Sequence, residues 1–129
     1  MPTLKAQSLF ITKQNGTLPR VPFLALKEKV LGKSYELSIA FVDEKTAQSL
    51  NKKYRNKTYI PNTLSFSLTP KSGEIVLCIP AIKKEYKNFE MTYKKYLIFL
   101  VIHSMLHLKG FEHGSTMESM EQKYLKLFS

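Results

Sequence analysis

Cysteine, tryptophan and long apolar runs are scarce or absent in this chain of 129 residues. The single cysteine, Cys78, excludes an internal disulfide and is compatible with a reducing compartment. The longest apolar run, residues 97–102, is far shorter than the roughly 20 residues that a membrane-spanning helix needs. The sequence also shows no signal peptide. We therefore expect a soluble, cytoplasmic protein.

Arginine is also scarce, although the chain is strongly basic. Its 20 basic residues include only two arginines, Arg20 and Arg55, so 18 are lysines; with 10 acidic residues the formal charge is +10. An excess of this size favours a polyanionic partner such as RNA, because phosphate contacts release condensed counterions. A lysine-rich surface that is merely solvated explains the charge equally well.

Hydrophobic periodicity predicts an α+β fold in a single domain, residues 1–129, because no linker or repeat divides the chain. The expected architecture is a mixed four-stranded β-sheet with one antiparallel hairpin, packed against about five α-helices. The expected strands are residues 4–11, 35–41, 63–68 and 74–79. The expected helices are residues 22–31, a helix capped by Asp43, residues 80–89, residues 92–110 and a last helix from residue 115.

Turn and cap residues punctuate this pattern. Asn15-Gly16 predicts a turn after the first strand, and the stretch 70–73, with Pro70, Ser72 and Gly73, predicts the hairpin turn. Ser115 with Glu118 has the spacing of a capping box. The buried stripe that we expect on the last helix comprises Met117, Met120, Tyr124 and Leu125.

All three histidines lie within eleven residues near the C-terminus. His103 and His107 are four apart on one face of the expected central helix, a spacing that lets two imidazoles bind one metal ion. Gly110 ends the helix, and a chain reversal there would return His113 to the pair. Three histidines would fill three of four tetrahedral positions and leave one open, as in catalytic rather than structural zinc sites. Structural or incidental histidines are the alternative.

The segment 103–113, HSMLHLKGFEH, resembles the signature H-G-x-L-H-L-x-G-[aromatic]-D-H of the YbeY family, which comprises bacterial metal-dependent endoribonucleases. The chain departs from it at Ser104, where Gly is usual, and at Glu112, where Asp is usual. Upstream, residues 50–55 (LNKKYR) are similar to the family's L-N-x-x-Y-R, and residues 73–77 (GEIVL) to its G-D-I-V-I. Residues 61–66 (PNTLSF) are similar to T-[DN]-V-L-S-F, with Pro61 in place of Thr.

This resemblance implies a hydrolase that cleaves single-stranded RNA in small-subunit ribosomal RNA 3′ end maturation and ribosome quality control. It implies a zinc-type ion on His103, His107 and His113, although three imidazoles also accept nickel or another metal. The ion would activate water or polarise the phosphodiester; attack by the RNA 2′-hydroxyl stays open. Implied partners are ribosomal RNA and the ribosome or its associated proteins, with no membrane and no disulfide-linked partner.

Arg55 is the second candidate, for catalysis and for RNA binding. In so lysine-rich a chain, an arginine indicates a role that lysine does not fill, and guanidinium binds phosphate through two parallel hydrogen bonds. The family also has a functional arginine at this motif position. A surface salt bridge at a helix end is the alternative.

Several other residues are weaker candidates. Glu112 could orient a histidine or act as general base, and a solvated loop carboxylate is an equal alternative. Asn62, Thr63 and Ser65 could line the cleft, and Cys78 is expected in the core. An RNA-facing groove could be formed by six lysines: Lys52, Lys53, Lys57, Lys83, Lys84 and Lys87.

Two other functions fit part of the pattern. A zinc peptidase would carry H-E-x-x-H with a glutamate as base, but this chain has Ser104 at that position. A ribosome-associated RNA-binding protein with a structural metal would need a fourth protein ligand. The only thiol, Cys78, lies far from the histidines in sequence, so nothing obvious supplies that ligand.

Overall fold

A computed structural model describes residues 3–6, 8–13 and 19–129 of the chain. Its sheet has the order β1-β2-β3-β5-β4. The strands are β1 (Thr3–Ala6), β2 (Leu9–Lys13), β3 (Glu36–Phe41), β4 (Thr63–Thr69) and β5 (Ser72–Leu77). The three central strands β2, β3 and β5 are parallel, and the antiparallel pairs β1/β2 and β4/β5 form the two edges.

The expected α+β class is confirmed, and the four expected strands form a mixed sheet with the hairpin β4/β5. The first strand differs from the prediction, because residues 4–11 divide between β1 and β2, which adds a fifth strand at the edge. Ser8, with a φ of 68°, lies in the turn between them. Neither Gly nor Pro marks this turn, so its sequence looked like a continuous strand. The expected turn at Asn15-Gly16 lies outside the described residues.

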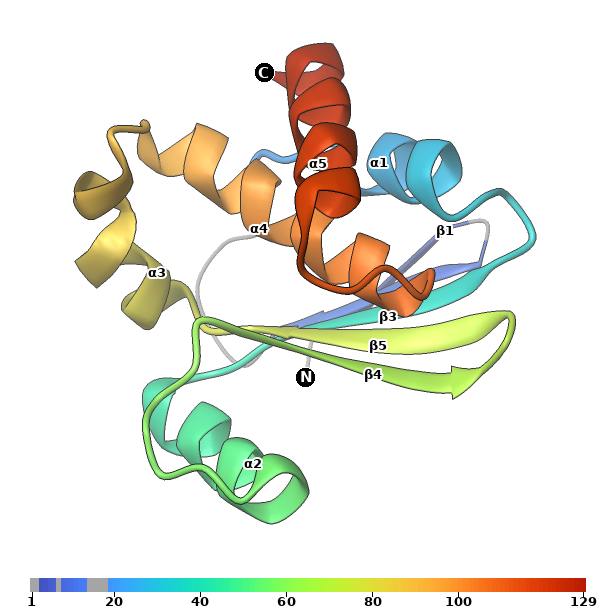
Figure 1. The fold of residues 1–129 in the computed structure, drawn as a ribbon. Coiled ribbons are helices and arrows are strands. Elements are labelled where there is room, and N and C mark those ends of the chain that lie inside the picture. The colour runs from blue at the N-terminus through green and yellow to red at the C-terminus, as the bar shows by residue number, and fades with distance from the viewer. Residues whose placement is uncertain (1–2, 7, 14–18) are drawn as a thin grey trace.

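Helices cover both faces of the sheet (Figure 1). On one face lie α1 (Phe23–Val30), α4 (Tyr93–Leu108) and α5 (Ser115–Phe128), and on the other lies α2 (Glu44–Arg55). The expected helix 80–89 is α3 (Ile79–Glu85) followed by a 3₁₀ turn, η1 (Tyr86–Phe89). None of the helices in the described ranges combines the length and apolar character that crossing a bilayer requires.

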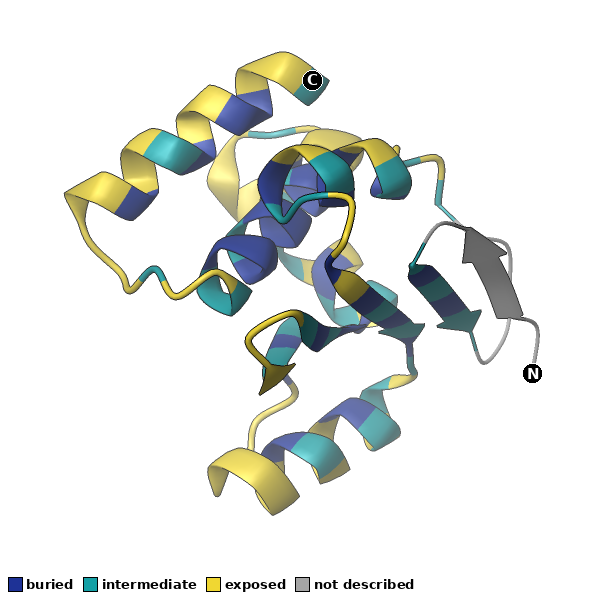
Figure 2. Ribbon diagram, turned by 90° about the vertical axis from the view of Figure 1, so that its right-hand side faces the viewer, coloured by how far each residue is buried: buried dark blue, intermediate teal, exposed yellow. Residues whose placement is uncertain are grey.

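The central element is α4, which packs on β4 and β5 and against α1 and α5. Most of its side chains are buried, and Figure 2 shows the buried residues gathered where the helices pack on the sheet. Thr92, where the helix was expected to begin, is its N-cap: the Thr92 hydroxyl accepts from the Lys95 amide at 3.2 Å. Asp43 likewise caps α2, accepting from the Thr46 amide at 2.8 Å. Hydrogen bonds from the backbone and side chain of Thr46 lower the pKa of the Asp43 carboxyl.

Two local predictions need correction. The capping box is absent, because α5 begins at Ser115 itself, after Gly114, with no side-chain cap. Gly73 lies inside β5 rather than in the hairpin turn. A Cβ there would come within 2.5 Å of the Tyr35 hydroxyl and 2.8 Å of Leu108, so glycine lets β5 pass close beneath the end of α4. Cys78 is buried, as expected.

Candidate metal centre

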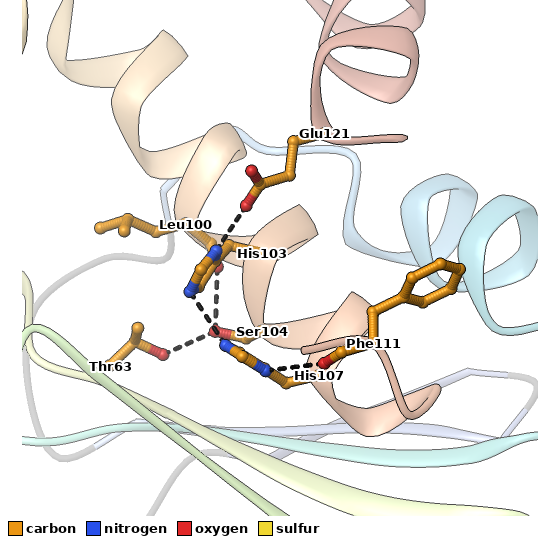
Figure 3. Close-up of polar contacts among 7 residues, drawn as sticks. All are labelled: Thr63, Leu100, His103, Ser104, His107, Phe111 and Glu121. Atoms are coloured by element: carbon orange, nitrogen blue, oxygen red, sulfur yellow. Dashed lines mark hydrogen bonds and ion pairs between the residues drawn. The ribbon is translucent and has the colours of Figure 1, made fainter. Parts of the chain in front are cut away.

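His103 and His107 point in the same direction from the last two turns of α4 (Figure 3). Their ring centroids are 4.6 Å apart, and their Nε2 atoms are 3.1 Å apart. Both side chains are half-buried. The four-residue spacing therefore produces the convergence that the sequence predicted.

The chain reverses at the end of α4 and brings His113 back to the other two histidines. The Phe111 amide donates to the Leu106 carbonyl at 3.0 Å, and the Gly110 amide donates to the His107 carbonyl at 3.0 Å. These two bonds, with Gly110 at a φ of 103°, form a Schellman motif that reverses the chain. The His113 ring then lies 5.2 Å from that of His103 and 4.8 Å from that of His107, centroid to centroid.

Hydrogen bonds fix which nitrogen of each α4 histidine carries its proton. His107 Nδ1 lies 3.1 Å from the Phe111 carbonyl oxygen, which can only accept. His103 Nδ1 contacts the carboxylate of Glu121, on α5. An ionised carboxylate also only accepts, so in both rings Nδ1–H donates and Nε2 keeps a lone pair. Such bonds to carbonyls and carboxylates are typical of metal-binding histidines.

The two Nε2 lone pairs therefore face each other at 3.1 Å. This arrangement is repulsive unless a proton or a metal cation lies between the rings. Tetrahedral coordination with bonds of about 2.0–2.1 Å places ligand nitrogens about 3.3 Å apart, close to this spacing. One atom from each of the three histidines lies within 4.8 Å of the others, so together they could hold one ion.

Electrostatics favour the neutral, ligating form of His107. Burial lowers the pKa of its imidazole below the ordinary value, and the neighbouring His103 lowers it further. A neutral imidazole is the form that donates a lone pair to a metal, so the ligand is ready at neutral pH.

The three histidines line a cleft of about 530 Å³ between α4, β4 and the end of α2. Asn62, Thr63 and Ser65 line it as predicted, and so does Arg55, the last residue of α2. Within the described part of the chain, no ion pair joins Arg55 to a carboxylate. The salt bridge that was the alternative explanation for this arginine is therefore not formed.

Comparison with known proteins agrees with this geometry. The sequence model of the family described as endoribonuclease YbeY matches residues 11–129. The chain belongs to the YbeY family. Proteins named endoribonuclease YbeY are 31% identical over 121 residues in Cupriavidus metallidurans and 39% identical over 95 residues in Bdellovibrio bacteriovorus.

These YbeY alignments cover 90% and 72% of this chain, and in each case 61% of the relative's own length. The fold is also similar to the solution structure of TM1509 from Thermotoga maritima, with a TM-score of 0.65 and 24% identity. That likeness covers 90% of this chain and 87% of the other.

A tyrosine that the sequence reasoning missed stands at the edge of this YbeY cleft. Tyr59 lines the cleft yet remains 54% exposed. Its backbone is held in place, because the Asn51 amide group donates to the Tyr59 carbonyl at 3.0 Å. Gln48 donates similarly to the Thr58 carbonyl at 2.7 Å. Asn51 is a buried residue of the LNKKYR motif, so this motif fixes the loop that carries Tyr59.

Ser104, which replaces the usual YbeY glycine, is buried beside the histidines. Its hydroxyl lies 2.9 Å from the Leu100 carbonyl one turn back and 2.9 Å from the Thr63 hydroxyl on β4. Sequence spacing could not decide where Ser104 points. The structure shows that it joins α4 to the wall of the cleft.

Glu112 lies where the alternative interpretation placed it, in solvent, and Glu121 is a residue that the sequence analysis did not single out. Glu112 is exposed, does not line the cleft, and makes no hydrogen bond or ion pair with the residues that the structure describes. The histidine contact considered for Glu112 is made instead by Glu121, which is only 5% exposed. Lys52, Lys53 and Lys57 are exposed near Arg55 but do not line the cleft.

Proposed function

We propose that this chain is a metal-dependent endoribonuclease that cleaves single-stranded RNA. The observation that carries the proposal is the cleft itself, which is lined by three histidines, an exposed tyrosine and an arginine that forms no ion pair with a described carboxylate. A divalent ion bound by His103, His107 and His113 would supply Lewis-acid chemistry toward water and the phosphodiester. Zinc suits three imidazoles with one open position.

Arg55 would hold the scissile phosphate. Its guanidinium can form two parallel hydrogen bonds to phosphoryl oxygens and stays charged as negative charge develops on them. The exposed Lys52, Lys53 and Lys57 nearby would attract the rest of the RNA backbone through their charge. Glu112 remains a candidate general base, although it would have to reach the cleft from an exposed turn.

Tyr59 supports a preference for unpaired RNA. Bases that are splayed out of a helix stack on aromatic side chains, whereas paired bases are already stacked on their neighbours. An exposed ring on an anchored loop offers such a surface at little entropic cost, because its backbone is already ordered.

The proposed substrate is ribosomal RNA, with roles in small-subunit 3′ end maturation and ribosome quality control, and with the ribosome or its associated proteins as partners. A cytoplasmic location follows from this substrate. The names of the relatives support RNA cleavage, and the net charge of +10 fits a polyanionic substrate.

The test uses a 5′-labelled single-stranded RNA, the same RNA as a duplex, and zinc-loaded protein. We expect the wild type to cut the single strand faster than the duplex, and His107→Ala to abolish cutting. Arg55→Lys should lower the cleavage rate at least ~10²-fold, because lysine keeps the charge but loses the paired donors. Circular dichroism checks that each variant is folded.

The outcomes separate the alternatives. Equal cutting by wild type and His107→Ala would refute the proposal and reveal a contaminating nuclease. Binding without cutting, with or without zinc, would favour an RNA-binding protein whose metal is structural. A 2′,3′-cyclic phosphate on the products would assign the attack to the RNA 2′-hydroxyl rather than to water.

A further inference from the structure

A second pocket lies away from the histidines and shares no lining residue with their cleft. Its volume is about 710 Å³. Four cationic side chains line it: Lys13, Arg20, Lys83 and Lys94. Apolar residues from β3, α3 and α4 form the rest, including Phe41, Ile79 and Leu97.

The pocket lies at the carboxyl ends of the parallel strands. Lys13 is the last residue of β2, Phe41 is the last residue of β3, and Ile79 follows β5 by two residues. After β2 the chain continues to α1 on one face of the sheet, and after β3 it continues to α2 on the other (Figure 1). Neighbouring parallel strands whose connections leave to opposite faces open a crevice at their carboxyl ends, where α/β proteins bind ligands.

The charge of this pocket has one sign. Among the described residues that line it there are four cations and no carboxylate. Arg20 and Lys94 are exposed and form no ion pair with the described residues, and the Lys83 ammonium lies 5.6 Å from the centroid of the Tyr93 ring. Arg20, Lys83 and Lys94 repel one another across the pocket, so binding of an anion among these three cations is favourable.

Arg20 indicates which class of anion the pocket would bind. The chain has two arginines, and each lines a different pocket: Arg55 the histidine cleft and Arg20 this one. Guanidinium is suited to phosphate, which it binds through two parallel hydrogen bonds. Tyr93 belongs to the first turn of α4, whose N-terminal end adds positive potential at the same place.

We propose that this pocket is a second phosphate-binding site, which holds backbone phosphates of an RNA strand whose scissile bond lies in the histidine cleft. The site rests on the proposed function for the identity of the RNA. Ten residues of α4 separate Tyr93 from His103, about 15 Å along the helix, a span that a strand of a few nucleotides can cover. Free nucleotides carry the same phosphate groups, so they are the other class of ligand that this pocket could bind.

The test measures binding rather than cleavage. A fluorescent single-stranded 20-mer RNA is titrated with metal-free protein, and the dissociation constant is followed across salt concentrations by anisotropy. The test variant is Arg20→Gln combined with Lys94→Gln. The matched control is Lys29→Gln combined with Lys126→Gln, which removes the same charge from exposed positions on α1 and α5.

We expect the pocket variant to weaken RNA binding about tenfold more than the control. The slope of log K against log salt should fall by about 1.4 in the pocket variant, about 0.7 for each lost phosphate contact, and stay unchanged in the control. Equal effects of the two variants would overturn the proposal and leave only diffuse surface charge. Because no cleavage is measured, failure of the proposed ribonuclease activity would not affect this result.

A second arm separates the two sources of phosphate. The same proteins are titrated with fluorescent ATP in place of RNA. Loss of RNA binding in the pocket variant, with ATP binding weak in all proteins, supports the RNA backbone. If the wild type and the control bind ATP tightly and the pocket variant does not, while all three bind RNA equally, the proposal is overturned and the pocket is a site for free nucleotides.

Discussion

Ser104 and Thr63 hydrogen-bond to each other across the interface of α4 and β4, with 2.9 Å between their hydroxyl oxygens. Ser104 stands where the YbeY signature usually has Gly. The Ser104 hydroxyl has a single proton, which it donates to the Leu100 carbonyl, so Thr63 is the donor of the shared bond. The side chain that replaces this Gly therefore has a hydrogen-bond partner on the neighbouring strand.

This pairing predicts that the two side chains are energetically coupled. Thr63→Val and Ser104→Ala should each lower the free energy of unfolding by about 1 kcal/mol, since each leaves a hydroxyl without its partner. The double variant should lose less than the sum, with a coupling of about 1 kcal/mol in urea denaturation. Ser65→Ala, on the same strand and in the same cleft, serves as the control and should not couple to Ser104→Ala. Additive effects of Thr63 and Ser104 would contradict the prediction.

Glu121 predicts a metal affinity that depends on the last helix. Its carboxylate accepts from His103 Nδ1 and so orients the ring and strengthens its Nε2 as a ligand. We expect Glu121→Gln to lower the affinity for zinc about 10- to 100-fold in competition with a chelator. Glu112→Gln, at the exposed carboxylate beside His113, should change the affinity little. A larger loss of zinc affinity in Glu112→Gln than in Glu121→Gln would show that Glu112, not Glu121, orients the metal ligands.

Tyr59 predicts a ring-dependent contribution to RNA binding. Tyr59→Ala should weaken the binding of single-stranded RNA to metal-free protein by about tenfold, because a stacked base contributes roughly 1–3 kcal/mol. Tyr59→Phe should keep the affinity, since the ring remains. Tyr54→Ala is the matched control, because Tyr54 is similarly exposed on α2 but does not line the cleft. An equal loss in both alanine variants would mean that stacking in the cleft contributes nothing.

His107 predicts a pH dependence of the metal-free protein. Burial lowers the pKa of His107, so in the range between that pKa and the unfolded value of about 6.5 the unfolded chain binds more protons. Stability should therefore be full above about pH 6.5 and decline as the pH falls through the folded-state pKa. Proton NMR of the His107 ring should show a midpoint below 6.5, and urea denaturation from pH 8 to pH 5 should show the decline. His107→Gln should make the free energy of unfolding less dependent on pH in this range. An unchanged dependence would show that another group causes it.

Much of the metal centre could be predicted because its determinants are local in sequence. The spacing of His103 and His107 is a property of one helix, and Gly110 supplies the positive φ that the chain reversal requires. The convergence of His113 follows from these two facts. For the same reason the strands of the hairpin β4/β5 were found, since alternation and turn residues lie next to one another in the chain.

Contacts between separate elements were harder to predict. Glu121 reaches His103 only because α5 packs on α4, eighteen residues further along the chain. The sequence nevertheless indicates that Glu121 is buried. It lies four residues from Met117 and from Leu125, so it falls on the expected buried stripe of α5. A carboxylate buried among apolar residues needs a partner, and His103 is that partner. Tyr59 had no comparable sign, because its exposure depends on how Asn51 anchors the loop.

The compact placement of the three histidines also bears on how metal acquisition relates to folding. Because His103, His107 and His113 are near neighbours in the chain, the unfolded polypeptide offers the same three imidazoles as a weak chelating peptide. An ion stabilises a fold only through its preference for the folded over the unfolded chain, and affinity for the unfolded chain reduces that gain. The preference here comes from the contact with Glu121 and from the motif that ends α4, both of which exist only after folding. The three ligands can thus capture an ion before the chain folds, and folding then tightens their hold on it.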